Sequence, residues 1–267
     1  MDCIVTDHWI DAPGGRLFAR RWTPSADGGA AAPLLLLHDS LGCVELWRGF
    51  PLALARASGR SVIAYDRLGF GRSGARQGKL PVGFIDDEAL VNIPLLCACF
   101  GFERFVVFGH SVGGGMAVHA AAAFPEDCIG LVTESAQSFV EERTRAGILE
   151  AKAQFARPGA MERLARYHGD KAPWVLAAWT DTWLSPAFSS WTLDAVLPRV
   201  ACPVLVLHGE DDEYGSPAQP ARIARGVAGP VECVLLPGVR HLPHREQEAA
   251  VAGRVAAFTA ALPARRP

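Results

Sequence analysis

One serine of the sequence stands in a setting that could make it a nucleophile. Ser111 is the centre of a Gly-His-Ser-Val-Gly motif at residues 109–113, followed by two more glycines. Residues 105–109 are predicted as a short buried strand, and residues 111–124 as a helix. A sharp strand-to-helix turn bares the serine hydroxyl and tolerates only small residues two positions away on either side. We therefore predict that Ser111 attacks a carbonyl group at a helix N-terminus, which favours the negative charge that develops there.

The same glycine-rich turn could instead bind a phosphate group through its backbone N–H groups. The dinucleotide-binding spacing G-x-G-x-x-G is, however, absent from residues 109–115. Phosphate binding is therefore the less favoured interpretation of this segment.

A serine hydroxyl is a weak nucleophile until a neighbouring base removes its proton. Two histidines, His241 and His244, follow a predicted strand at residues 231–236. Where the serine of a Gly-x-Ser-x-Gly turn is the nucleophile, the base comes late in the chain, after the acid that orients it. Either histidine could therefore be the base that activates Ser111.

The acid that orients the base is expected just after the predicted strand at residues 204–208. Asp211 and Asp212 both lie there, within the segment Gly-Glu-Asp-Asp. This carboxylate would hold the histidine in one tautomer and stabilise its protonated form. Glu134 ends a predicted strand of its own and is a third candidate. The simpler interpretation is that its carboxylate is solvated or contacts a helical cap that covers the sheet edge.

Short apolar runs alternate with helix-like stretches along the chain, which predicts an α/β fold with a mainly parallel sheet covered by helices on both faces. Two strands that alternate apolar and polar residues, joined by a turn at 13–15, are expected to be antiparallel and lie at 3–10 and 16–22. The other predicted strands are short and buried, at 34–38, 62–66, 105–109, 129–134, 204–208 and 231–236. The predicted helices are at 44–58, 87–100, 111–124, 217–227 and 245–262. Pro94 should kink the second helix or begin a shorter one, and residues 25–32 form a loop of small residues.

Residues 137–197 interrupt this alternation, because they contain charged helix formers and then a cluster of aromatic residues but no buried strand. The segment is too long for a plain connection. We interpret it as a helical cap over the carboxyl edge of the sheet. Its tryptophans, Trp179 and Trp183 among them, either line a substrate pocket or anchor the cap to the core.

The composition excludes several classes of function. The formal net charge is −2 and no Lys/Arg-rich block is present, so nucleic acid is not an expected partner. No apolar run approaches the length needed to cross a membrane, and the absence of an export signal predicts a cytoplasmic location. The seven scattered cysteines lack zinc-site spacing and are expected to be small apolar residues. The oligomeric state stays open, with a homodimer as one of the alternatives.

Together these segments resemble the α/β-hydrolase superfamily over nearly the whole chain. The resemblance implies a mostly parallel eight-stranded sheet, a core formed by residues 1–136 and 198–267, and a cap formed by residues 137–197. It favours Asp212 as the acid, because the acid commonly follows a glycine by three positions. It favours His241 as the base, although Arg240 replaces the usual glycine before it.

The resemblance also implies an oxyanion hole made of two backbone N–H groups, those of Val112 and Ser40. The loop that holds Ser40 reads His-Asp-Ser-Leu-Gly at residues 38–42, with Asp39 where the family has glycine. His38 is expected to be a structural hydrogen-bonding residue. The segment Asp-Arg-Leu-Gly-Phe-Gly-Arg-Ser at residues 66–73 resembles a family turn whose glycines supply positive φ angles.

These residues predict a serine hydrolase that cleaves a carboxylic ester or related acyl bond through an acyl-enzyme, without a metal or other cofactor. The expected substrate is a small molecule with an apolar or aromatic acyl part. Trp47, His110, Trp179 and Trp183 are the candidate pocket residues, although Trp47 could equally pack helix against sheet.

Three other readings of the same residues stay open. One is hydrolysis of a carbon–carbon bond in a ring-cleavage diketone, which Leu242 after the histidine disfavours because a tryptophan is usual there. The others are perhydrolase activity and an inactive ligand-binding module of the same fold.

The arginines of the cap have two interpretations. They could pair with an acidic substrate group or belong to a solvated helix face, and they include Arg143, Arg145 and Arg163.

Overall fold

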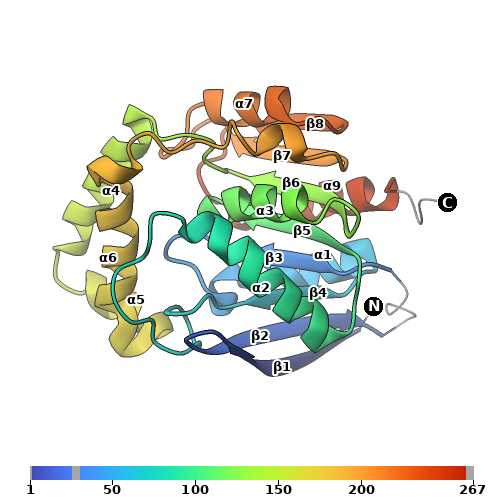
Figure 1. Ribbon diagram of the computed structural model, residues 1–267, viewed down its shortest axis with the longest axis horizontal. Coiled ribbons are helices and arrows are strands. Elements are labelled where there is room, and N and C mark those ends of the chain that lie inside the picture. The colour runs from blue at the N-terminus through green and yellow to red at the C-terminus, as the bar shows by residue number, and fades with distance from the viewer. Residues whose placement is uncertain (1, 26–30, 263–267) are drawn as a thin grey trace.

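A computed structural model describes residues 2–25 and 31–262. Most of the predicted loop at residues 25–32 lies outside the described residues. One eight-stranded sheet runs through the molecule in the order β1-β2-β4-β3-β5-β6-β7-β8 (Figure 1). Its strands are β1 Cys3–Ala12, β2 Gly15–Pro24, β3 Leu34–Leu37, β4 Val62–Tyr65, β5 Phe105–His110, β6 Cys128–Glu134, β7 Val204–Gly209 and β8 Val231–Leu236. From β4 to β8 all neighbouring strands are parallel, while β1 and β2 are antiparallel. The prediction of a mostly parallel α/β sheet is confirmed.

The central strands show why the sheet forms from these residues. β3 consists of four leucines, all fully buried. Because side chains alternate between the two faces of a strand, Leu35 and Leu37 join the apolar cluster on one face while Leu34 and Leu36 join the cluster on the other. A strand that is apolar at every position is therefore stable only with helices on both sides.

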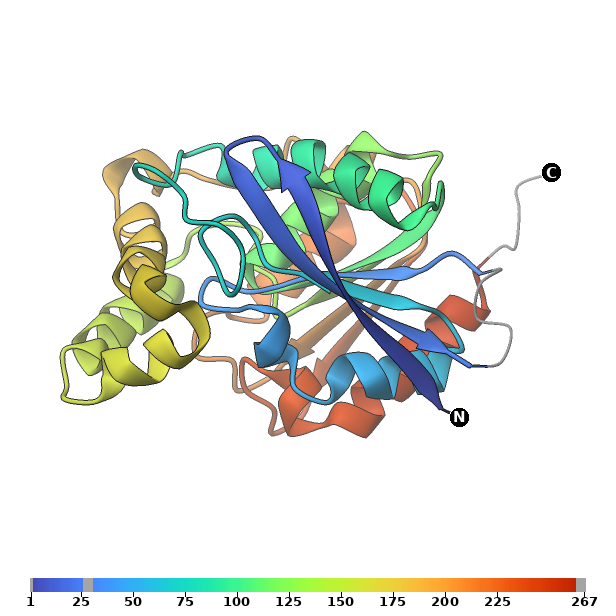
Figure 2. The ribbon, with the colours of Figure 1, turned by 90° about the horizontal axis from the view of Figure 1, so that it is seen from below.

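Helices supply this cover in two layers, which Figure 2 shows on opposite sides of the sheet. The first layer contains α2 Phe84–Phe100, α3 Val112–Ala123 and α7 Ala218–Gly226, and the second contains α1 Phe50–Ser58 and α9 Glu248–Ala260. The helix α2 continues through Pro94 without a break, so the alternative of a shorter helix starting there was wrong.

Two predicted helices are each divided in the structure. The stretch 44–58 forms a 3-10 turn η1, Val44–Trp47, and then α1, because Pro51 lacks the N–H group that a helix interior needs and is tolerated only in a first turn. The stretch 245–262 forms a short helix α8, Pro243–Glu246, and then α9, with a non-helical residue Gln247 between them.

The strand β8 lies at the edge of the sheet and is mostly exposed, so the prediction that it is a buried strand was wrong. It pairs only with β7. Val231 and Leu235 are each 39% exposed. An apolar run does not reveal whether a strand has one neighbour or two, and β8 has one.

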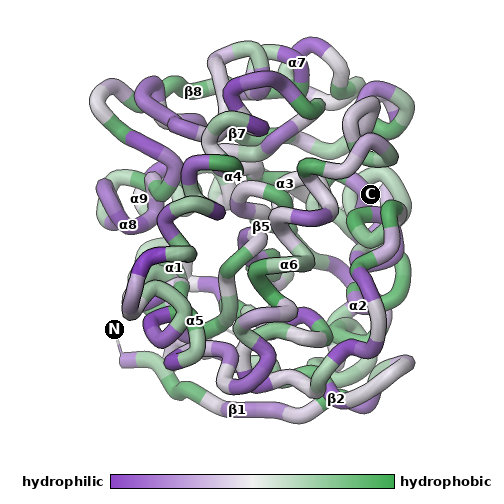
Figure 3. The backbone as a smooth tube through the Cα atoms, turned by 90° about the vertical axis from the view of Figure 1, so that its left-hand side faces the viewer, coloured by the Kyte–Doolittle hydropathy of each residue, from purple (hydrophilic) through white to green (hydrophobic). Residues whose placement is uncertain are grey.

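The segment between β6 and β7 lies across the carboxyl ends of the central strands (Figures 1 and 3). It contains α4 Glu142–Phe155, α5 Ala160–His168 and α6 Ala172–Trp183, followed by two short 3-10 turns, η3 Pro186–Phe188 and η4 Leu197–Arg199. Stacked rings of Phe188 and Trp191 pack beside Trp183 at its base. No helix among the described residues is both long and apolar enough to cross a membrane.

Polar contacts hold this segment, here called the cap, against the core. His168 at the end of α5 contacts the Leu41 carbonyl with Nε2 (3.0 Å) and accepts the Gly71 N–H at Nδ1 (2.9 Å). Lys171 donates to the carbonyl oxygens of Gly71 and Ser73, each at 2.8 Å. The cap is thereby bonded to the loop at residues 66–73 and to the loop that follows β3.

Candidate active site

Ser111 lies on a strained turn between β5 and α3. Its backbone has φ 55° and ψ −125°, a conformation that residues other than glycine rarely adopt. A side chain at Gly109 would collide with the backbone of Gly113, and one at Gly113 would collide with the carbonyl group of Leu37. The glycines two positions before and after Ser111 are therefore needed for the turn to close.

An acid and a histidine meet beside this turn. Asp212 follows β7 and His241 follows β8, and the His241 Nδ1 atom lies 2.9 Å from both carboxylate oxygens of Asp212. The two loops are joined by a hydrogen bond from the Asp211 N–H to the Val239 carbonyl (2.9 Å). The Asp212 carboxylate also accepts two backbone N–H groups, from Tyr214 (2.8 Å) and Gly215 (3.1 Å).

These contacts set the charges of the pair. Burial alone would raise the pKa of Asp212, but the charge and hydrogen bond of His241 lower it to about 2. Burial alone would lower the pKa of His241, but the Asp212 carboxylate raises it above its ordinary value of 6.5. His241 is thus stabilised as an imidazolium and has its Nδ1 oriented by an ionised carboxylate.

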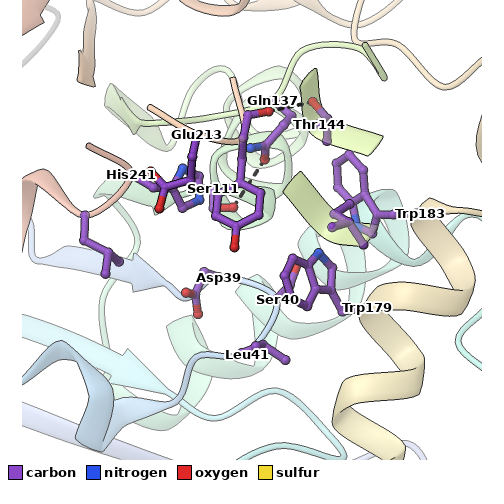
Figure 4. Close-up of a pocket in the computed structure, with 13 residues that line it drawn as sticks. Asp39, Ser40, Leu41, Ser111, Gln137, Thr144, Trp179, Trp183, Glu213 and His241 are labelled. Atoms are coloured by element: carbon purple, nitrogen blue, oxygen red, sulfur yellow. Dashed lines mark hydrogen bonds between the residues drawn. The ribbon is translucent and has the colours of Figure 1, made fainter. Parts of the chain in front are cut away.

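Ser111 and His241 line one cavity of about 190 Å³ beneath the cap (Figure 4). The cavity is bounded by the loops after β3, β5, β6, β7 and β8 and by α4 and α6. Its lining residues are Asp39, Ser40, Leu41, Ser111, Gln137, Thr144, Ile148, Trp179, Trp183, Glu213, Tyr214, His241 and Leu242. The Ser111 hydroxyl donates to the Gln137 Oε1 atom at 3.3 Å.

A profile of the alpha/beta hydrolase family matches residues 34–254, which is most of the chain. The chain belongs to this family. The match extends from β3 to α9 and so includes every loop that carries a catalytic candidate.

Curated relatives of this alpha/beta hydrolase support hydrolase activity. The chain is 25% identical over 202 residues to a putative carbamate hydrolase, RutD, of Stutzerimonas stutzeri (strain A1501). The aligned region covers 68% of this chain and 74% of that protein. It is 28% identical over 184 residues to the serine hydrolase BPHL of Homo sapiens, which covers 67% of this chain and 62% of that protein.

Solved structures show the same fold. VinJ superimposes with a TM-score of 0.78 at 21% identity, covering 97% of this hydrolase and 99% of that chain. The enol-lactonase of Burkholderia xenovorans LB400 superimposes with a TM-score of 0.73 at 21% identity, covering 95% and 100% of the two chains.

The two residues predicted to supply the oxyanion hole, Val112 and Ser40, lie directly after Ser111 and at the cavity, respectively. Val112 begins α3, so its N–H belongs to the first helical turn, where N–H groups have no intrahelical partner. Ser40 lines the cavity in the loop after β3. Asp39 lines it too, which places a carboxylate beside the site.

The two loops predicted to be structural have structural hydrogen bonds. His38 is buried and accepts the Arg67 N–H at its Nε2 atom (3.1 Å). Asp66 accepts the N–H groups of Val44 (2.6 Å) and Arg72 (2.7 Å), and two positive-φ glycines follow it, at residues 69 and 71. These bonds fix the loop after β3 to the loop at residues 66–73.

Two of the four predicted pocket residues need correction. Trp179 and Trp183 line the cavity, but Trp47 and His110 do not. Trp47 is buried between Phe50, Phe108 and a histidine ring, and it packs helix against sheet. His110 is buried, and its Nε2 atom contacts the His241 carbonyl at 2.8 Å.

Among the charged residues, the interpretation of Glu134 also needs correction. Glu134 is neither solvated nor in contact with the cap, because it is fully buried and its Oε2 atom lies 2.6 Å from the His244 Nδ1 atom. Arg143, Arg145 and Arg163 do not line the cavity. Arg143 and Arg163 are exposed, as expected for a solvated helix face, and Arg143 also donates to the Asp212 carbonyl at 3.2 Å.

Sequence reasoning missed several polar residues that line the cavity with Ser111. Gln137 and Tyr214 follow the ends of β6 and β7, at the same edge of the sheet as the candidate catalytic residues. Their position directly after buried strands was the available signal. Glu213 and Thr144 complete the polar lining.

One group of side chains in the described part of the chain could hold a metal ion, namely His110, Glu134 and His244, whose ligand atoms lie within 4.8 Å of one another. Each of these side chains already makes a hydrogen bond. His244 Nδ1 contacts Glu134 Oε2, and His110 Nε2 contacts the His241 carbonyl at 2.8 Å. Because these contacts already join the side chains to one another or to the His241 loop, we describe the group as a hydrogen-bonded cluster.

Proposed function

We propose that this alpha/beta hydrolase cleaves a carboxylic ester or a related acyl bond through Ser111, His241 and Asp212. The observation that carries the proposal is convergence: three loops far apart in the sequence place a strained serine and an aspartate-bound histidine at one cavity. An acyl-transfer site needs a nucleophile, a base and an orienting acid in this arrangement.

The proposed reaction has two halves. Ser111 turns its hydroxyl from Gln137 to the Nε2 atom of His241, which takes the proton as the serine oxygen attacks the ester carbonyl. The N–H groups of Ser40 and Val112 stabilise the resulting oxyanion. The imidazolium then protonates the leaving alcohol, and an acyl-enzyme remains. In the second half a water molecule gives its proton to His241, attacks the acyl group and releases the acid with regeneration of Ser111.

The cavity supports an uncharged, apolar or aromatic acyl group. A dry cavity of about 150 Å³ accepts benzene, so about 190 Å³ holds an aromatic ring or a short acyl chain. Three aromatic side chains line it: Trp179, Trp183 and Tyr214. Its carboxylates, Asp39 and Glu213, would repel an acidic acyl group, and within the described part of the chain neither lysine nor arginine lines it.

Ester turnover by the wild-type protein and by Ser111→Ala tests the proposal. With p-nitrophenyl acetate, butyrate and benzoate we expect kcat to fall on the order of 10³-fold or more in the variant, and a fluorophosphonate probe to label the Ser111 peptide of the wild type only. Equal rates would remove Ser111 from the mechanism. A ring-cleavage diketone belongs in the same panel, because faster turnover of that substrate would replace the ester proposal by carbon–carbon bond hydrolysis.

The acyl-charge preference is tested with matched esters of butyric acid and of mono-ionised succinic acid. We expect the butyrate to have the higher kcat/KM. A preference for the anionic ester would contradict the account of Asp39 and Glu213.

A further inference from the structure

Three ionisable side chains are buried together behind the cavity and have no role in the proposed chemistry. His110 is the last residue of β5, Glu134 is the last residue of β6, and His244 lies in α8. Their exposed fractions are 2%, 0% and 2%. The ring of His110 lies between those of His241 and His244, at centroid distances of 5.1 and 4.9 Å.

Each of these residues bonds the turn that carries Ser111 to the loop that carries His241. His110, the neighbour of Ser111, contacts the His241 carbonyl through Nε2 at 2.8 Å. Since a carbonyl can only accept, the His110 Nε2 carries the proton. Glu134 accepts the Ser111 N–H at its backbone carbonyl (2.9 Å) and contacts His244, three residues after His241, through its carboxyl group (2.6 Å).

We propose that His110, Glu134 and His244 form a positioning element that fixes the catalytic loop of His241 against the turn of Ser111. The inference rests on the proposed function, since it assumes that Ser111 and His241 exchange a proton. A misplacement of about 1 Å between such groups can lower the rate on the order of 100-fold. Two side-chain contacts that reach the same short loop would limit that error.

The energetics favour this role over simple packing. Burying polar groups costs free energy that an apolar cluster of the same volume would not incur. The Glu134 Oε1 atom is buried without a hydrogen-bond partner, so the carboxyl group is not optimised for stability alone. Apolar side chains could fill the same space, but they could not hold a carbonyl group at a fixed distance.

The charges of the cluster are compatible with turnover. Burial, with the nearby His244, lowers the pKa of His110 to about 4, and burial, with the nearby Arg245, lowers that of His244 to about 3. Both rings are therefore neutral near pH 7. The imidazolium that His241 becomes during the reaction would not face a second positive ring in the cluster.

The test compares two side chains that differ by one methylene group. In His110→Gln the amide nitrogen reaches the former position of Nε2 and can still donate to the His241 carbonyl. In His110→Asn it ends one methylene short. We expect His110→Asn to lower kcat on the order of 10- to 100-fold with KM within about twofold, and His110→Gln to restore most of the loss. Val255→Ala in α9, a buried residue that lines neither the cavity nor the cluster, is the control for lost stability and should leave kcat unchanged at a similar melting temperature.

A signal independent of turnover completes the design. The proton between His241 and Asp212 should give a low-field NMR resonance, which is assigned by its loss in His241→Gln. We expect this resonance to shift or broaden in His110→Asn and to return in His110→Gln. Glu134→Asp and Glu134→Gln give the same comparison for the contact with His244 and replace the first pair should His110 variants fail to fold.

The outcomes separate the two proposals. If His110→Asn and His110→Gln both keep the kcat and the resonance of the wild type while Ser111→Ala is inactive, the positioning role alone is overturned. Equal ester turnover by wild type and Ser111→Ala would overturn the proposed function, and the resonance would still decide whether the cluster positions His241.

Discussion

Two carboxyl–imidazole pairs lie side by side in this molecule and differ in almost every electrostatic property. Asp212 and His241 meet at the cavity, where burial is outweighed by mutual attraction: the pKa of the acid falls to about 2 and that of the base rises. Glu134 and His244 meet behind the cavity, where burial dominates. The pKa of Glu134 rises to about 7 and that of His244 falls to about 3.

The charge of His241 is the largest cause of the lowered pKa of Asp212, and hydrogen bonding adds to the difference between the pairs. The Asp212 carboxylate accepts the N–H groups of Tyr214 and Gly215 in addition to His241, so its charge is stabilised from several sides. The Glu134 carboxyl group has His244 on one oxygen and no partner on the other. The same two functional groups thus form a pair with a strongly acidic carboxyl group at the cavity, and a pair with a weakly acidic carboxyl group where burial dominates.

The largest expected effect concerns the acids. Asp212→Asn should lower kcat on the order of 10⁴-fold, because an amide no longer holds His241 in the required tautomer. Asp211→Asn is the matched control: this neighbouring side chain is exposed and should change kcat by less than about twofold. Ester kinetics of the two variants measure the contrast, and similar losses in both would mean that the acid has been assigned to the wrong residue.

A second expected effect is on the stability of the buried pair. The pKa of Glu134 is about 7 in the folded protein against an ordinary value of 4.5, so the folded state binds the extra proton between these values. Its contribution to stability is complete below pH 4.5 and is lost as the pH rises through 7. Glu134→Gln lacks this loss, so its stability relative to wild type should rise by on the order of 2–3 kcal/mol from pH 4.5 to 8.

Urea unfolding at both pH values measures this difference. A constant difference between Glu134→Gln and wild type would show that Glu134 ionises normally, and the contrast between the two pairs would then be lost.

The smallest expected effect is on the pH profile of the catalytic pair. Turnover needs neutral His241, so kcat/KM should fall as the pH drops through a value above 6.5. The Asp39 and Glu213 carboxylates both contribute to this raised pKa. Asp39→Asn should therefore move the acid limb to lower pH, and Glu213→Gln should move it less. An acid limb that moves upward in Asp39→Asn would contradict this assignment.

Much of the fold could be predicted because the signals were local. The four leucines at residues 34–37 specify a strand buried on both faces, and glycines around Ser111 specify a sharp turn. Burial at the edges depends on the number of neighbours, which one segment does not encode, and this is why β8 was predicted to be buried.

The candidate site likewise contains residues that local sequence signals predict and residues that they do not. The loops of Ser111, Asp212 and His241 follow strand ends in a fixed order, so their convergence at one edge of the sheet could be predicted. The choice of Asp212 over Asp211 and of His241 over His244 needed the resemblance to the family.

The placement of Glu134 and His110 could not be predicted, because it depends on how α8 packs behind the sheet. The cap residues of the cavity depend likewise on how the cap lies against the core.

The rate at which a fluorophosphonate modifies Ser111 tests the central claim most directly, because it needs no assumption about the natural substrate. Peptide mapping confirms the modified residue, and wild type is compared with His241→Gln. We predict adduct formation on Ser111 in the wild type and a decrease in rate on the order of 10³-fold or more in His241→Gln. An unchanged rate in that variant would contradict the claim that His241 activates Ser111.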